Sequence, residues 1–65
     1  SAKLTVDVLA HYLDFLDSGS LVILDDYGHV GFVDTRKSVD LWIEKNSGKV
    51  YSIISPTDQG IIFWK

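Results

Sequence analysis

The stretch Leu4 to Leu16, LTVDVLAHYLDFL, decides the fold of this chain. At about 100° per residue, its apolar side chains form a stripe along one face of an α-helix. Thr5 can cap the N-terminus, and Gly19 can take the left-handed position after the last turn. The pattern predicts one amphipathic helix over residues 4–17 whose main stripe covers a sheet. That stripe consists of Val6, Leu9, Ala10, Leu13 and Leu16.

A second apolar stripe, made of Val8, Tyr12 and Phe15, lies beside the first on the same helix. Apolar residues therefore cover well over half of the circumference, whereas an ordinary surface helix shows a stripe of roughly 100° or somewhat more. Because the first stripe is sufficient to cover a sheet, we expect the second to contact a protein partner or a second copy of the chain. A narrow polar strip remains, consisting of Asp7, His11 and Asp14.

The rest of the chain has the pattern of short strands separated by turns. Residues 21–24 and 61–64 are apolar at consecutive positions, which is typical of strands covered on both faces. The turns Asp25–Gly28 (DDYG) and Asn46–Lys49 (NSGK) are typical of hairpins. The predicted strands are residues 20–25, 29–34, 38–45, 50–55 and 61–64.

Residues 38–45 fit two interpretations. Apolar and polar residues alternate there, which predicts a strand with one solvated face. The same residues could form a short helix in which Val39, Trp42 and Ile43 make the apolar stripe. The NSGK turn favours the strand, and on a strand Trp42 points to the solvated face. Exposed tryptophan is enriched at binding hot spots, so Trp42 is a candidate partner contact. Packing of Trp42 under the helix or against Tyr51 is the interpretation that we favour over this contact.

These elements predict a single α+β domain over residues 1–65. An N-terminal helix would pack on a four- to five-stranded antiparallel meander and cover one of its faces. The strands could also curl into a small barrel of SH3-like shape.

Composition limits the classes of partner and the cellular compartment. The chain has 65 residues, no cysteine and a net charge of −3. It therefore has no disulfide framework and no thiolate metal site, which favours the cytoplasm or an assembly that supplies additional burial. Nucleic-acid binding normally needs a basic surface, and the only adjacent basic residues are Arg36 and Lys37. The predicted helix is too short to cross a membrane.

Two clusters contain residues that can bind metal ions. The first is the strip Asp7, His11 and Asp14, and the second is the turn with Asp25, Asp26 and His29. Solvation of the helix explains the first cluster, and the preference of aspartate for turns explains the second. No serine lies in a nucleophile motif and no glycine-rich phosphate loop is present. We therefore expect no catalytic residue, no metal and no cofactor.

The surplus of apolar surface predicts a small non-enzymatic protein–protein interaction module that associates with itself through the apolar helix. An acidic inhibitor or immunity-type protein is the alternative, because residues 7–26 contain five acids that could cap a basic enzyme site. A small-ligand-binding barrel is the third interpretation.

Overall fold

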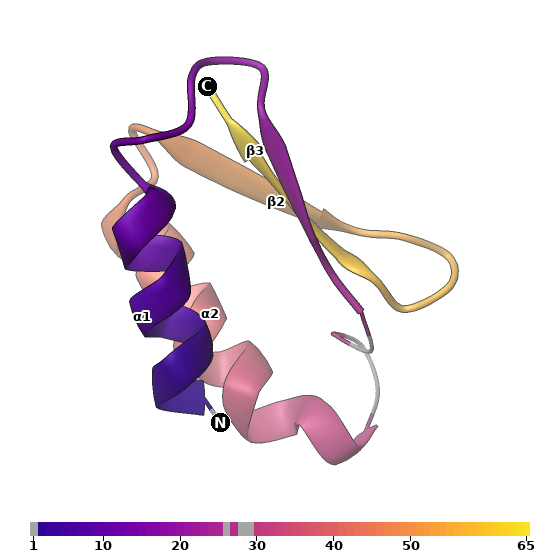
Figure 1. Ribbon diagram of the computed structural model, residues 1–65. Coiled ribbons are helices and arrows are strands. Elements are labelled where there is room, and N and C mark those ends of the chain that lie inside the picture. Colours follow the sequence, from indigo (N-terminus) through magenta and orange to yellow (C-terminus); the bar gives the residue numbers. More distant parts are fainter. Residues whose placement is uncertain (1, 26, 28–29) are drawn as a thin grey trace.

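The computed structural model describes residues 2–25, 27 and 30–65. In these residues two helices lie side by side against one face of a three-stranded antiparallel sheet (Figure 1). The α+β class is confirmed, and the sheet is open rather than closed into a barrel. In chain order the elements are α1 (Ala2–Tyr12), β1 (Leu21–Leu24), the 3₁₀ turn η1 (Val30–Phe32), α2 (Val33–Lys45), β2 (Val50–Ile54) and β3 (Gly60–Trp64).

The strand order is β1-β3-β2, so the last strand of the chain lies in the centre of the sheet. Both outer strands are antiparallel to β3 and therefore run parallel to each other. Parallel strands need a long connection, which α2 supplies between β1 and β2. The predicted meander of four to five strands is therefore wrong, although the strands at 20–25, 50–55 and 61–64 are confirmed.

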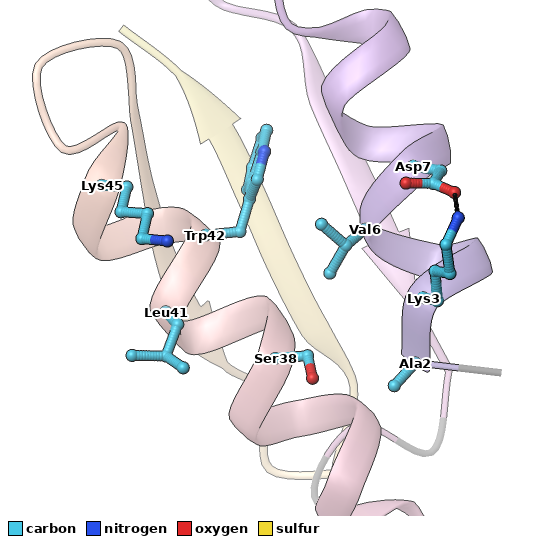
Figure 2. Close-up of a pocket in the computed structure, with 8 residues that line it drawn as sticks. All are labelled: Ala2, Lys3, Val6, Asp7, Ser38, Leu41, Trp42 and Lys45. Carbon is cyan, nitrogen blue, oxygen red and sulfur yellow. Dashed lines mark hydrogen bonds and ion pairs between the residues drawn. The ribbon is translucent and has the colours of Figure 1, made fainter.

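Two predicted strands are helical instead. Residues 38–45 belong to α2, and the 29–34 segment forms η1 and the first turn of α2 over its described residues. The helical alternative for 38–45 is thus correct, and Trp42 lies in the core between α2 and α1 (Figure 2). Asn46 is the C-cap residue of α2, and its backbone N–H makes a helical hydrogen bond of 3.1 Å to the carbonyl of Trp42. Its side-chain amide donates to the same carbonyl at 2.8 Å. A residue that ends a helix resembles one that begins a hairpin turn, which explains the wrong prediction.

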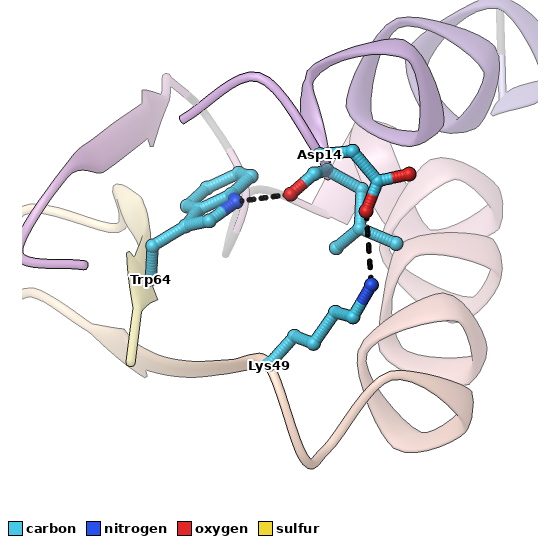
Figure 3. Close-up of polar contacts among 4 residues, drawn as sticks. Asp14, Lys49 and Trp64 are labelled. Carbon is cyan, nitrogen blue, oxygen red and sulfur yellow. Dashed lines mark hydrogen bonds and ion pairs between the residues drawn. The ribbon is translucent and has the colours of Figure 1, made fainter. Parts of the chain in front are cut away.

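The N-terminal helix ends at Tyr12, five residues earlier than predicted. The carbonyl of Leu13, just beyond this end, accepts a 2.9 Å hydrogen bond from the indole Nε1 of Trp64 (Figure 3). Next to it, Lys49 forms a 2.9 Å ion pair with Asp14. The helix begins at Ala2, so Thr5 lies inside it, and Gly19 takes its positive φ of 90° in the turn before β1.

The core lies between the helices and the inner face of the sheet. From α1 it takes Leu9, with Val6 of the same helix and Leu13 and Leu16 beyond its end packed around it. The first stripe is thus confirmed except at Ala10, which is exposed. Burial alternates along β3, where Gly60, Ile62 and Trp64 are buried and Ile61 and Phe63 between them are half-buried. Among the residues that the structure describes, the buried hydrophobic ones are Leu9, Tyr27, Val39, Trp42, Val50, Ile62 and Trp64.

Tyr27, in the segment after β1, contacts both helix α2 and strand β3. Its hydroxyl donates a hydrogen bond to Asp40 of α2, and partial burial raises the pKa of the Asp40 carboxyl above its ordinary value. Its ring packs directly on the backbone of Gly60, where a side chain would leave no room for it. The sequence placed Tyr27 only in a turn, because burial of this ring depends on a glycine 33 positions away.

Candidate functional site

An apolar groove runs between α1 and β1. Its volume is about 330 Å³, and the hydroxyls of Thr5 and Tyr12 are the only polar side-chain groups among the described residues that line it. The backbone of α1 packs closely on that of α2 but stands apart from that of β1. The helix and the strand thus form two separate walls with apolar side chains between them. The walls are Leu4, Thr5, Val8, Leu9 and Tyr12 on α1, and Val22 and Leu24 on β1.

The second stripe of the N-terminal helix is divided by the structure. Val8 and Tyr12 line the groove and are 46% and 44% exposed. Phe15 lies beyond the end of α1, is 71% exposed and packs at 5.2 Å from the ring of His11. Leu4 takes a place in the groove that the sequence did not assign. Leu4 lies four residues before Val8 and therefore on the same face of the helix, and this spacing could have identified it.

The outer edge of β1 presents open backbone groups. The amide of Trp64 donates to the carbonyl of Ser20, so Ser20 and every second residue after it direct their backbone groups toward β3. Val22 therefore hydrogen bonds to β3, whereas the N–H and C=O groups of Leu21 and Ile23 point away from β3. Within the described part of the chain, no strand pairs with this edge.

β1 carries none of the devices that protect sheet edges in monomeric proteins. Such edges usually contain lysine, proline or a bulge, because an open row of N–H and C=O groups attracts other strands. All four residues of β1, LVIL, are apolar. The prediction that this strand is covered on both faces is wrong for the single chain, because Leu21 and Ile23 are 49% and 56% exposed. The edge is therefore suited to pairing with another strand.

A second apolar surface covers the face of the sheet that points away from the helices. Side chains alternate between the two faces of a sheet, so every second residue of each strand points outward. The register brings these residues together in two rows across the three strands. We call this surface the outer face; its rows are Leu21, Phe63 and Tyr51, and Ile23, Ile61 and Ile53.

Trp42 does not belong to either surface. It is 8% exposed and forms part of a separate depression of about 480 Å³ between the two helices (Figure 2). At the rim, Lys3 donates a 2.8 Å hydrogen bond to Asp7, and this bond raises the pKa of Lys3. The expectation that Trp42 lies on a solvated strand is thus corrected, because the helical period turns its side chain inward.

The acidic residues of the first half of the chain do not form one free patch. Asp7 is paired with Lys3, Asp14 with Lys49, and Asp25 accepts a hydrogen bond from Gln59. Among residues 2–25, 27 and 30–65, no three His, Asp or Glu side chains converge on a possible metal position. Asp26 and His29 of the predicted turn cluster lie outside the described residues.

The described helices are all too short or too polar to cross a membrane. Comparison with known proteins finds no matching family model, no matching curated protein and no matching solved structure.

Proposed function

We propose that this domain is a non-enzymatic protein-interaction module that associates with a second copy through α1 and the open edge of β1. The observation that carries the proposal is an apolar groove beside an unprotected edge strand. Another extended backbone can pair with the whole row of N–H and C=O groups at once, and apolar side chains suit the groove. A second copy supplies both, because its β1 is an open strand and its α1 presents the apolar side chains of Leu4, Val8 and Tyr12.

The most symmetrical arrangement is an antiparallel pairing of the two β1 strands about a twofold axis at Val22. Leu21 then lies opposite Ile23 of the second copy, and both pairs exchange N–H···O bonds. About four hydrogen bonds form in this way, each contributing ~0.5–1.5 kcal/mol. The result is a continuous six-stranded sheet with all the helices on one side.

The same axis brings the two α1 helices together above the paired edges. Leu4, Val8 and Tyr12 from each copy then face one another and close the groove. Full burial of a large apolar side chain contributes ~1.5–3 kcal/mol, and in the single chain these three residues are still between 44% and 63% exposed. After the penalty for association, we expect a dissociation constant on the order of 10–100 µM.

The two other interpretations have less support. An acidic inhibitor needs carboxylates that are available to a basic enzyme, and both Asp7 and Asp14 are already ion-paired. A ligand-binding barrel needs a closed sheet, and this sheet is open.

Substitution of Val8 by lysine is expected to weaken the dimer at least tenfold, because it places two cations near the twofold axis of an apolar contact. Sedimentation equilibrium between about 1 µM and about 1 mM measures the effect. The matched control is Leu41→Lys, which makes the same kind of change at a 58% exposed position of α2 that does not line the groove. If the wild-type chain remains monomeric throughout, or if Leu41→Lys weakens association as much as Val8→Lys, the proposal fails.

Hydrogen exchange tests the strand pairing directly. We expect the amides of Leu21 and Ile23 to exchange rapidly in dilute solution and to become protected as the concentration rises. The amides of Ser52 and Ile54 provide an internal control, because the hydrogen-bonding pattern between β2 and β3 leaves them pointing away from β3, at the opposite edge of the same sheet. Equal protection at both edges, or none at Leu21 and Ile23 in the associated state, would contradict pairing through β1.

A further inference from the structure

The outer face of the sheet is not used by the edge-to-edge dimer. Leu21, Ile23, Tyr51 and Ile53 are between 46% and 56% exposed, and Ile61 and Phe63 between them are half-buried. The rings of Tyr51 and Phe63 stack at 5.0 Å with an interplanar angle of 12°, which gives the face a flat aromatic region. All six side chains are apolar, so a partner for this face needs a matching flat, uncharged surface.

The area of the outer face determines which assembly can bury it. A half-exposed large apolar side chain offers on the order of 100 Å², so one copy offers roughly 400–500 Å². Two single copies packed face to face would bury about 800–1,000 Å², which is below the ~1,200–2,000 Å² of a stable interface. Two edge-paired dimers would bury about twice as much, roughly 1,600–2,000 Å², which lies within that range.

We propose that the outer faces of two edge-paired dimers pack against each other, so that this chain assembles as a tetramer with four layers, helices–sheet–sheet–helices. This inference rests on the proposed dimer, because only edge pairing makes the face large enough. Two sheets packed in this way lie about 10 Å apart, with their strands rotated by about 30°. The assembly has three mutually perpendicular twofold axes, a common symmetry for tetramers.

The tetramer predicts an ordered assembly in which the dimer forms first. At rising concentration the wild-type chain should pass from monomer to dimer to tetramer, with few trimers. A substitution on the outer face should remove only the second step, whereas a substitution in the groove should remove both. This order distinguishes the proposed tetramer from nonspecific aggregation of apolar surfaces.

Ile53→Lys is the test variant. Ile53 is 50% exposed on β2, which is the edge strand opposite β1, so its replacement leaves the β1 edge intact. We expect the variant to raise the dissociation constant of the tetramer at least tenfold and to leave that of the dimer unchanged, because it places four cations in the apolar interface. Ile53→Thr is the second variant if lysine disturbs folding, since it keeps the β-branched shape and removes apolar area.

Sedimentation velocity and equilibrium up to about 1 mM, with Val8→Lys and Leu41→Lys in parallel, distinguish the outcomes. A tetramer that dissociates to dimers in Ile53→Lys and to monomers in Val8→Lys supports the inference. A wild-type chain that never exceeds a dimer overturns it and leaves the proposed function intact. A tetramer that survives both Ile53 variants also overturns it. A wild-type chain that stays monomeric overturns the proposed function and this inference together.

Discussion

Replacement of Ile62 by alanine is expected to destabilise the domain by about 2–5 kcal/mol. Ile62 is fully buried at the centre of β3, between Val22 of β1 and Ser52 of β2. The substitution removes three carbon atoms from the core and leaves a cavity. A domain of this length has a free energy of unfolding of roughly 3–10 kcal/mol, so the variant is expected to lose a large part of it.

Urea unfolding followed by tryptophan fluorescence measures this loss, because both tryptophans are buried. The matched control is Ile61→Ala, one position earlier on the same strand. Its side chain points to the outer face and is only half-buried, so a smaller loss is expected in dilute solution, where the outer face is not covered. Equal losses at the two positions would contradict the assignment of the inner and outer faces of β3.

Substitution of Gly60 by alanine is expected to destabilise the domain by about 2 kcal/mol or more, although alanine is a small residue. A Cβ at this position would lie 2.5 Å from Cγ of Tyr27 and 3.0 Å from its Cβ. These atoms are at the base of the side chain, so the ring cannot avoid the clash by changing its outer torsion. Tyr27 also donates a hydrogen bond to Asp40, so its displacement loosens the contact with α2.

Thermal unfolding measures the effect of this substitution, and about 2 kcal/mol corresponds to a decrease in Tm of roughly 8–16 °C for a domain of this size. Gly48→Ala is the control, because a Cβ there meets nothing within 4 Å. The double variant Gly60→Ala/Tyr27→Ala should lose less stability than the sum of the single variants, since the two residues are in contact. Additive losses would show that the clash is not the cause.

The candidate site could be predicted from the sequence only in part. Val8 and Tyr12 were identified because a second apolar stripe on one helix can be recognised from helical period alone. The β1 wall of the groove could not be identified, because sequence spacing does not show which strand lies beside a helix. Trp42 was assigned to a solvated face because an eight-residue alternation fits a strand as well as a helix.

The outer face was missed for a related reason. The consecutive apolar residues of 21–24 and 61–64 predict strands covered on both faces, which is the usual meaning of such a pattern. The structure places helices on one side only, so the second side is a surface rather than core. A sequence shows that a segment is apolar, but the tertiary structure decides whether the same chain covers it.

By itself, the sequence determined the α+β class, the N-terminal helix with its core-facing stripe, and three of the strands. These features depend on local periodicity, which involves residues a few positions apart. Only the tertiary structure decided that β3 lies between β1 and β2, that residues 33–45 form a helix, and that Tyr27 is buried on Gly60. Such features depend on contacts between residues far apart in the chain, where the gain in packing outweighs weak local preferences.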